Sequence, residues 1–477
     1  MSIPAAYGDT APIAAIATAA GEGALALIRT SGEHCLELLG DVFSRSEKLL
    51  KAAGNTIVHG WIIGTGGEKI DEVLISVYRG PRTYTGEDGA DISCHGGIAA
   101  AKAIMETLRG TGFRDSLPGE FSFRAFMNGK LDLTRAESVM EIVSAKTGLA
   151  REHAVHRLSG ALEKEIRGIN TIIVQALGAS EIFLDYSEDD GIGAENNSET
   201  EAAEAVGLLP DRPLVEEALE RLKILAASYR RERLYAEGAL GVIAGRPNAG
   251  KSSLFNMLLH EDRSIVTDVP GTTRDWIEAW VSIEGIPVRL TDTAGIHPSE
   301  DPVEKLGMER SRQLLSEADM ILYVIDGTEG ITPEDRDFLR DHRTLPVILL
   351  WNKADLAFPP SSQFSPAASF RPVSAKTGAG ISGLSREMAG VLEKRFSGGR
   401  EGNAWNPAGI GTARQKELID RAAAALEEAL ALADRAEPLD LIAPLLREGV
   451  NALGEITGEV STAEILNTMF SRFCVGK

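Results

Sequence analysis

The chain has 477 residues, 43% of them apolar and 25% charged, which predicts roughly three folded domains and excludes a mostly disordered protein. Acidic residues outnumber Lys and Arg by 70 to 49, for a formal net charge of −21. This charge excludes a protein that coats nucleic acid over its whole surface, although local basic contacts remain open. The three scattered cysteines, Cys35, Cys94 and Cys474, form neither a disulfide framework nor a CxxC metal site, which is typical of a reducing compartment.

The beginning of the chain lacks the features of a secretory segment. Its first basic residue is Arg29, so the basic region that opens a signal peptide is missing. No uninterrupted apolar run reaches the roughly 18 residues that a membrane-spanning helix needs. We therefore expect a soluble cytoplasmic protein with no membrane association.

Residues 1–125 are predicted to form a compact α+β domain. They are rich in glycine and contain short strand-like runs, such as Asn55–Ile63 and Glu72–Tyr78, separated by turn residues.

Residues 126–236 carry a helical pattern instead. Their clearest apolar stripe, with helical spacing, is formed by Val215, Leu219, Leu222, Ala226 and Tyr229. Between the helices, the stretch from Asp185 to Val206 holds eight acids and no Lys or Arg. We predict a solvated loop there, with a binding role as the alternative.

Residues 237–396 alternate apolar strand-like runs with helical segments. Strands so apolar are covered on both faces, which predicts a parallel sheet in an α/β domain; the runs are Leu240–Ala244, Val288–Leu290, Met320–Ile325 and Val347–Leu350. A Gly/Asn linker at Gly398–Asn406 follows, and residues 397–477 return to helical stripes, such as the one through Leu418, Ala422, Leu426 and Ala429. The α/β unit is therefore predicted to be inserted between two halves of one helical domain.

The strongest motif is the sequence GRPNAGKS at Gly245–Ser252, which fits G-x-x-x-x-G-K-[ST] between a predicted strand and a predicted helix. Glycines in such a loop let backbone N–H groups surround phosphate oxygens, and the helix N-terminus adds a favourable dipole. Lys251 is expected to reach the β- and γ-phosphates, and Ser252 to offer a hydroxyl to Mg²⁺.

Four further motifs follow in order, GTTRD (Gly271–Asp275), DTAG (Asp292–Gly295), NKAD (Asn352–Asp355) and SAK (Ser374–Lys376). Residues 240–395 thereby resemble a translation-factor-like GTPase domain. The resemblance implies that Thr273 completes the Mg²⁺ shell, that Asp292 binds Mg²⁺ through water, and that the Gly295 N–H meets the γ-phosphate. Asp355 accepts two hydrogen bonds from guanine, and adenine would leave that carboxylate unpaired, so GTP is the expected nucleotide.

The catalytic device departs from the common pattern, because Ile296 and His297 stand where many GTPases place a water-orienting Gln. Asn248 in the phosphate loop suggests a K⁺ ion beside the phosphates, which supplies the charge of an arginine finger. The alternatives are that Asn248 only fits the turn, or that Arg246 or Arg274 provides the charge.

The two flanking regions carry a more specific resemblance. The motifs are PRTYTGED (Pro81–Asp88), HGG (His95–Gly97), PGEFSFRAFMNGKLDLTRAES (Pro118–Ser138) and the terminal Cys474-Val475-Gly476-Lys477. With the GTPase motifs, they resemble the MnmE (TrmE) family of tRNA wobble-uridine modification GTPases over nearly the whole chain. The implied fold is an α/β P-loop GTPase domain inserted in an all-α helical domain and preceded by an α+β folate-binding domain.

The same resemblance implies a function and partners. The N-terminal domain would bind a formyl- or methylene-tetrahydrofolate and form a constitutive homodimer. With an FAD-dependent MnmG-type partner, in a heterotetramer, the protein would install an aminomethyl or carboxymethylaminomethyl group at C5 of the wobble uridine of tRNA. K⁺ and GTP would bring the two GTPase domains together and so drive hydrolysis.

Site residues follow from the resemblance position by position. Folate binding falls on Arg29, Glu87, Lys130 and Lys477; K⁺ on Asn248, Thr267, Val269 and Thr272; Mg²⁺ on Ser252 and Thr273; and catalysis on Glu304 (which would position water), Asn248 and Lys251. Cys474 is a candidate reactive thiol, or else simply a packed residue. The implied GTP contacts are Asn248, Ala249, Gly250, Lys251, Ser252, Ser253, Thr267, Asp268, Val269, Pro270, Gly271, Thr272, Thr273, Asp292, Thr293, Ala294, Gly295, Asn352, Lys353, Ala354, Asp355, Ser374, Ala375 and Lys376.

Two other functions share these motifs. A ribosome-assembly or membrane-associated GTPase switch would carry a basic RNA-binding module or a basic amphipathic helix after the GTPase domain, and the C-terminal region is instead acidic and rich in Ala, Leu and Glu. A folate-binding metabolic enzyme with an accessory GTPase domain would not need GTP hydrolysis for its reaction.

Overall fold

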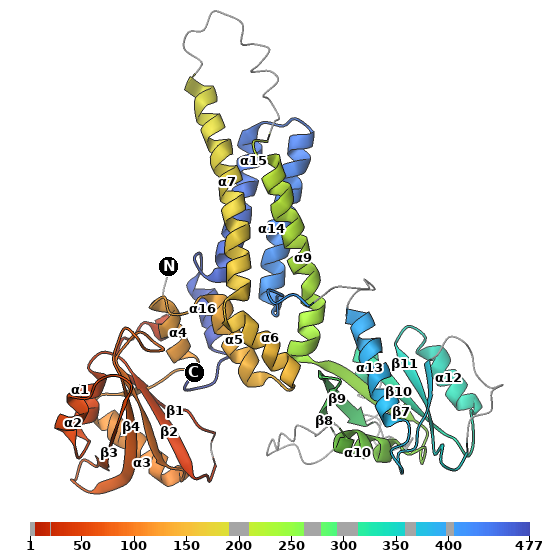
Figure 1. Cartoon of the computed structure of the whole chain (residues 1–477), viewed down its shortest axis with the longest axis horizontal. Helices are drawn as coiled ribbons and strands as arrows, with labels where there is room; N and C mark the ends of the chain where they lie inside the picture. Colours follow the sequence, from red (N-terminus) through yellow and green to blue (C-terminus); the bar gives the residue numbers. More distant parts are fainter. Residues whose placement is uncertain are drawn as a thin grey trace, which may run out of the picture. The chain divides into compact units, whose positions relative to one another are not determined.

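The computed structural model describes residues 5–19, 21–189, 209–261, 278–292, 313–357, 369–396 and 405–477. The chain divides into two compact units (Figure 1). Unit 1 comprises Met1–Met140, Glu163–Leu219 and Arg421–Lys477, and unit 2 comprises Glu141–Leu162 and Glu220–Asp420. Within the described part of the chain, no helix has the length and apolar character needed to cross a membrane.

Unit 1 contains a six-stranded sheet in the order β3-β4-β5-β2-β1-β6. Neighbouring strands are antiparallel, except that the two-residue β6 runs parallel to β1. The strands are β1 (Ile13–Ile16), β2 (Leu25–Ser31), β3 (Thr56–Ile63), β4 (Lys69–Tyr78), β5 (Gly89–His95) and β6 (Arg114–Asp115). The two strand-like runs of the sequence are confirmed as β3 and β4, in which alternate residues, such as Val58 and Ile62 of β3 and Ile75 of β4, are buried on one face.

Three helices cover that face, α1 (Cys35–Asp41), α2 (Ser46–Leu50) and α3 (Ile98–Thr111). Buried strand residues such as Ile28, Ile75 and Ile92 share one core with Leu36 and Ile104 from the helices. The α+β expectation for this region is confirmed.

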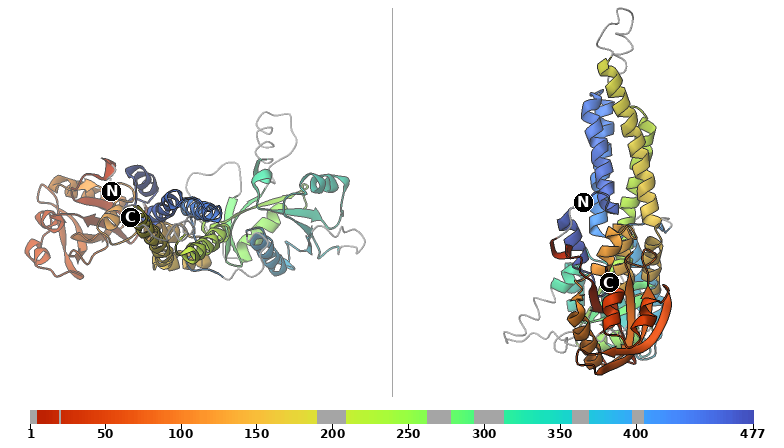
Figure 2. Two further views of the ribbon diagram at one scale, coloured as in Figure 1. Left: turned by 90° about the horizontal axis from the view of Figure 1, so that it is seen from above. Right: turned by 90° about the vertical axis from the view of Figure 1, so that its left-hand side faces the viewer.

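The other helices of unit 1 form a bundle and a small C-terminal cluster. The bundle helices α7 (Ala161–Asp189) and α15 (Leu439–Thr457) run side by side (Figure 2), and an ion pair of 2.6 Å joins Glu181 to Arg447. Gly449 of α15 lies against Leu426 of α14 (Ala413–Asp434). The boundary between the two units falls within α14, whose residues from Arg421 onward belong to unit 1. The predicted acidic loop at 185–206 is wrong at its start, because α7 continues to Asp189. No Gly or Pro interrupts the sequence between Gly178 and Gly191, so nothing stops the helix earlier.

The C-terminal helix α16 (Ala463–Phe470) packs against the N-terminal region of unit 1. Phe470 contacts Tyr7, Phe123 and Phe126, with ring centroids 5.5–6.5 Å apart, and also Phe473 at 5.3 Å. Phe123 and Phe126 belong to α4 (Glu120–Met127), which precedes α5 (Leu133–Ser144). The last residues of the chain are thereby brought to the sheet of unit 1.

Unit 2 contains the second six-stranded sheet, in the order β12-β11-β10-β7-β9-β8. Its helices lie on both faces, with α10 (Lys251–Glu261) and α13 (Ile381–Phe396) on one side and α12 (Pro333–Asp341) on the other. The strands are β7 (Ala239–Gly245), β8 (Glu278–Ile283), β9 (Ile286–Asp292), β10 (Met320–Asp326), β11 (Val347–Asn352) and β12 (Ser369–Pro372). The α/β expectation is confirmed for the parallel strands. The edge strand β8 is antiparallel to β9, because Glu284 and Gly285 both have positive φ and form a two-residue turn.

Two helices of unit 2 lie next to this α/β fold, α6 (Gly148–Leu158) and α9 (Arg212–Glu237), whose first eight residues belong to unit 1. Leu149 packs on the β8–β9 turn at Gly285. A buried ion network joins α6 to α9, in which Arg157 contacts Glu232 at 2.7 Å and His153 contacts the same carboxylate at 3.0 Å. Because both partners of each pair are buried, separating α6 from α9 would leave unpaired buried charge, which is strongly destabilising.

Candidate functional site

The loop between β7 and α10 has the backbone of a phosphate-binding loop. Its φ angles are positive at Gly245 (141°), Asn248 (64°) and Gly250 (97°). A Cβ added at Gly245 would lie 2.3 Å from the Val324 carbonyl oxygen, so a side chain does not fit there. The strand–loop–helix context that the motif requires is therefore present, with the loop at the N-terminus of α10.

Lys251 and Ser252, at the start of α10, are held by neighbouring groups. The buried Lys251 ammonium donates to the carbonyl oxygens of Gly245 (2.9 Å) and Arg246 (2.8 Å). Burial lowers the pKa of the Lys251 ammonium, and the Asp292 carboxylate opposes that shift. Ser252 Oγ donates to Asp292 Oδ2 at 2.8 Å. The hydroxyl and carboxylate predicted to serve Mg²⁺ therefore lie together, and such oxygen ligands suit that cation.

Asn352 joins the phosphate loop to the loops expected to bind the base. Its Nδ2 donates to the Ala249 carbonyl at 2.8 Å, and its Oδ1 accepts from the Ala375 N–H at 3.0 Å. A Cβ added at Gly250 would lie 2.1 Å from this Nδ2, so the glycine also makes room for the bridge. Three of the predicted motifs thus meet at one buried amide.

The Asp355 carboxylate is exposed and oriented by its neighbours. Ser374 Oγ donates to Asp355 Oδ1 at 2.7 Å, and this hydrogen bond lowers the pKa of the Asp355 carboxyl. Lys353, whose φ is 61°, forms a 2.5 Å ion pair with Asp326 at the end of β10. An ionised, accessible carboxylate of this kind suits a base edge that carries two N–H donors.

Asn248 and Arg246, the two described candidates for supplying positive charge at the phosphates, differ in their surroundings. Asn248 is exposed, in the left-handed conformation that Asn tolerates better than most residues. Arg246 is engaged in ion pairs with Glu329 at 2.9 Å and Glu334 at 3.5 Å. The Arg246 guanidinium is therefore already paired with carboxylates. The exposed Asn248 amide is compatible with both the cation-binding and the turn-fitting interpretation.

Several predicted site residues lie outside the described residues. They are Thr267, Asp268, Val269, Pro270, Gly271, Thr272, Thr273, Thr293, Ala294, Gly295 and Glu304, together with Arg274, Ile296 and His297. Their assignments stay predictions.

A second cluster of predicted residues lies in unit 1, around Arg29 of β2. Arg29 Nε lies 3.1 Å from Asp91 Oδ1, and Arg29 Nη1 donates to the Gly476 carbonyl at 3.1 Å. Tyr78 donates to the same aspartate at 3.3 Å. The C-terminal tail that carries Lys477 is thereby fixed beside Arg29.

The predicted Glu87 is held in the same part of unit 1. Glu87 accepts hydrogen bonds from Ser31 (2.7 Å) and from Arg124 Nη1 (3.2 Å to Oε2). Lys130 donates to the Pro81 carbonyl at 2.8 Å, and its Cδ lies 3.5 Å from where a Cβ of Gly86 would stand. Arg29 and Ser31 are two residues apart on β2 and therefore share a sheet face. Glu87 and Arg29 are thus brought to one surface, with Lys130 beside the Glu87 loop. The thiol of Cys474 is exposed in the tail.

Sequence reasoning missed the partners that hold these groups. Asp326 follows an apolar strand run, a position that often carries polar site residues in parallel sheets, so that signal was available. Asp91 and Arg124 gave no comparable signal, because their partners are distant in the sequence.

The phosphate loop, the guanine-type NKAD loop and the parallel sheet beneath them define a P-loop GTPase domain. Residues 12–130 match the family described as "GTP-binding protein TrmE N-terminus", and residues 133–474 match "MnmE helical domain". The tRNA modification GTPase MnmE of Treponema denticola is 42% identical over 479 residues, and that of Lacticaseibacillus paracasei is 40% identical over 474; each alignment covers 98% of both chains. The chain belongs to the MnmE family of GTPases.

Among solved structures, Era of Aquifex aeolicus bound to GDP and AlF₄⁻ is 28% identical, and the match covers 39% of this chain and 66% of that one. The TM-score of this match is 0.27.

Proposed function

We propose that the protein is a cytoplasmic GTP hydrolase that acts in the modification of tRNA. The observation that carries the nucleotide assignment is the Asn352 bridge, which joins the phosphate loop to the Asp355 and Ala375 loops. The tRNA assignment rests on relatives of the same length that are named tRNA modification GTPases. At a net charge of −21, affinity for tRNA has to come from a local patch or from a partner protein.

The proposed hydrolysis uses two cations. Mg²⁺ would be held by Ser252, with Thr273 and a water on Asp292, and it would neutralise charge on the phosphates. K⁺ would be held by Asn248 with Thr267, Thr272 and the Val269 carbonyl, where it supplies positive charge in place of an arginine finger. The exposed Asn248 amide supports this role, and Glu304 is the proposed residue that positions the attacking water.

The K⁺ proposal is tested by comparing GTPase rates in KCl and NaCl. We expect a much faster rate in KCl, and loss of that stimulation in Asn248→Ala. Asn55→Ala is the matched control, because Asn55 is also exposed, in unit 1, with a φ of 61°. Replacing either asparagine by alanine therefore places alanine in the same unfavourable left-handed conformation. Equal rates in the two salts for the unmodified protein would remove the K⁺ role.

The Arg29 cluster is the proposed site for a tetrahydrofolate one-carbon donor. Arg29, Lys130 and Lys477 suit the carboxylates of a glutamate tail, and the Glu87 carboxylate suits the N–H donors of a pterin. The ion pairs and hydrogen bonds described above hold Arg29 and Glu87 in fixed positions, which reduces the entropy lost on binding.

The open face of the sheet in unit 1 is the proposed homodimer surface. It lies opposite α1, α2 and α3, and it presents Leu25, Ile57 and Leu74 with exposed fractions of 68%, 65% and 47%. Apolar groups gathered on one face mark interaction sites, and twofold dimers are the commonest assemblies. An FAD-dependent MnmG-type protein is the proposed partner for the tRNA reaction.

The experiment that tests the function is nucleoside analysis of tRNA from cells that lack this protein. We expect loss of the aminomethyl or carboxymethylaminomethyl group at C5 of the wobble uridine. The chromosomal deletion is complemented with the wild-type gene or with the gene for Asp355→Asn. The Asp355→Asn variant is expected to prefer xanthosine triphosphate over GTP, and therefore to leave the tRNA without this modification. Intact modification together with accumulated ribosomal precursors would instead support a ribosome-assembly switch.

A further inference from the structure

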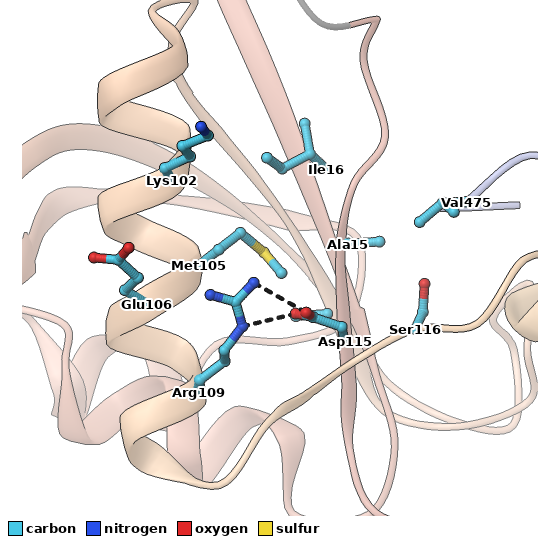
Figure 3. Close-up of a pocket in the computed structure, with 10 residues that line it drawn as sticks. Ala15, Ile16, Lys102, Met105, Glu106, Arg109, Asp115, Ser116 and Val475 are labelled. Carbon is cyan, nitrogen blue, oxygen red and sulfur yellow. Dashed lines mark hydrogen bonds and ion pairs between the residues drawn. The ribbon is translucent and has the colours of Figure 1, made fainter.

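Unit 1 contains a cavity of about 600 Å³ that the proposed function does not use (Figure 3). It lies between α3, the edge of the sheet at β1, the residues after β6, and the C-terminal tail. β6 pairs only with Ile13 and Ala14, so β1 continues past it and Ala15 and Ile16 line the cavity together with Met105 and Val475. Most of the wall is therefore apolar, and its size suits a small organic molecule.

Ser116 places an unsatisfied hydroxyl in this wall. Its backbone N–H donates to the Ala14 carbonyl at 3.0 Å, which anchors the residue directly after β6. Its side chain is buried, with 7% of the residue exposed, and Oγ has no hydrogen-bond partner among the residues that the structure describes. Figure 3 shows this hydroxyl pointing toward Val475. A buried hydroxyl without a partner is unfavourable, and a ligand that pairs with it recovers that loss.

The charged groups around the cavity leave one cation available. Arg109 and Asp115 neutralise each other through two hydrogen bonds of 2.9 and 3.0 Å. Lys102 is exposed on α3 and has no ion pair within the described ranges. In Figure 3, Lys102 lies across the cavity from Ser116, and the Glu106 carboxylate points away from the cavity.

We propose that this cavity binds a small, largely apolar carboxylate that carries a hydrogen-bonding group at its far end. The carboxylate would face Lys102, the apolar body would lie against Met105, Ile16 and Val475, and the far polar group would pair with Ser116 Oγ. Charge-assisted and buried hydrogen bonds at the two ends give orientation, and the apolar wall gives affinity.

This site differs from the Arg29 cluster. Ala14 of β1 belongs to the core on the helix-covered face of the sheet, whereas Arg29 and Glu87 lie toward the other face. The two sites adjoin at β1, where the cavity residue Ala15 pairs with Arg29 across the ladder. They also adjoin at the tail, where Val475 lines the cavity and the next residue, Gly476, accepts the hydrogen bond from Arg29. A ligand in the cavity would therefore restrain the tail without contacting the proposed folate residues.

The test uses the full chain with ¹³C-methyl methionine and 4-hydroxybenzoate as the probe, with Met105 as the local reporter and its signal assigned through Met105→Leu. We expect a saturable shift of the Met105 methyl resonance. Benzoate lacks the far polar group, and 4-hydroxybenzamide lacks the charge, so each is expected to bind about tenfold more weakly. No shift of the Met105 signal at millimolar probe would overturn the proposal.

Two variants assign the ends of the ligand. Lys102→Gln is expected to weaken 4-hydroxybenzoate about tenfold and to leave the neutral amide unchanged, and Ser116→Ala to weaken 4-hydroxybenzoate but not benzoate. Lys48→Gln removes an exposed ammonium from α2 and is the control expected to have no effect. If Lys102→Gln weakens acid and amide equally, or if Ser116→Ala has no effect on 4-hydroxybenzoate, the proposed orientation is wrong. Folate affinity measured on the same variants is expected to stay unchanged, so this outcome is independent of the Arg29 site.

Discussion

The nucleotide site of unit 2 and the Arg29 cluster of unit 1 are built in opposite ways. In the nucleotide site, the hydrogen bonds of Lys251 reach back only five and six residues, to Arg246 and Gly245. In the Arg29 cluster, the hydrogen bond from Arg29 to Gly476 spans 447 residues, and that from Arg124 to Glu87 spans 37. The phosphate loop of the first site depends on the backbone of one segment, and a single side chain, Asn352, ties it to the other loops across 103 residues. The second site depends throughout on charged side chains that only the complete fold brings together.

This difference determines where each site is sensitive. A loop built from backbone groups tolerates little change at its glycines, because the conformation itself provides the binding groups. A cluster of side chains depends on the buried charges that orient it, and it therefore responds to protonation. Substitutions of the two kinds should separate the two sites.

The largest effect is expected for Gly250→Ala in the phosphate loop. Its φ of 97° is strained for a residue with a side chain, and the added Cβ would stand 2.1 Å from the Asn352 amide. That amide is fixed by two hydrogen bonds, so it cannot move without breaking the bridge. We expect GDP affinity to fall about 100-fold, a loss of about 3 kcal/mol, measured with a fluorescent GDP analogue.

Gly67→Ala is the control for backbone strain alone. Gly67 has a φ of 83°, and no atom of the described residues lies within 4 Å of a Cβ added there. We expect about 1 kcal/mol of lost stability and unchanged GDP affinity. Equal GDP affinity in both variants would mean that the Asn352 bridge is not needed for binding.

The next effect concerns Glu120, whose ion pair with Arg124 helps to position Glu87 of the Arg29 cluster. Only 1% of Glu120 is exposed, and it pairs with Arg114 at 2.5 Å and with Arg124 at 3.0 Å. Burial raises the pKa of the Glu120 carboxyl, but hydrogen bonds from Arg114 and the Leu117 N–H outweigh it, so the pKa lies below its ordinary value. Its ionised form therefore stabilises unit 1 above the ordinary glutamate pKa of about 4.3, and that contribution is lost as the pH falls through the lower folded value.

We expect Glu120→Gln to lose about 3 kcal/mol at pH 7, because it leaves buried guanidinium groups without a charged partner. The difference from the unmodified protein should shrink below about pH 4. Urea unfolding, with hydrogen exchange of the β1 and β6 amides as the local readout, measures both quantities. Glu47→Gln, on an ion pair whose glutamate side chain is 91% exposed, should change little at either pH. A pH-independent loss in Glu120→Gln would contradict the charge argument.

The same contrast explains how much could be predicted from the sequence. Strands β7, β10 and β11 were predictable because burial on both faces leaves continuous apolar runs, and the phosphate loop because its spacing is local. The antiparallel edge strand β8 was not predicted, since two turn residues reverse its direction. The Arg29 cluster was assigned only through family resemblance, because no local pattern shows that Asp91 or Gly476 lies beside Arg29. The cavity at Ser116 gave no signal at all, since its walls come from β1, α3 and the last residues of the chain.

The smallest of these effects is expected for Arg29→Ala. The substitution removes the 3.1 Å hydrogen bond to Gly476 and the ion pair with Asp91, whose carboxylate keeps the hydrogen bond from Tyr78. Because Asp91 retains a partner, the loss of stability should be modest, and the main consequence should be a freed tail. We expect 5-formyl-tetrahydrofolate to bind about tenfold more weakly, about 1.4 kcal/mol, with faster hydrogen exchange at Gly476 and Lys477.

Two further variants separate the charge of Arg29 from its contacts. Arg29→Lys keeps the charge but cannot contact Asp91 and Gly476 together, so its folate affinity should be intermediate. Arg447→Ala, which removes a surface ion pair from α15, should leave folate affinity unchanged. If Arg29→Ala binds folate normally while the tail exchanges faster, the arginine anchors the tail and the folate-binding role falls to other residues.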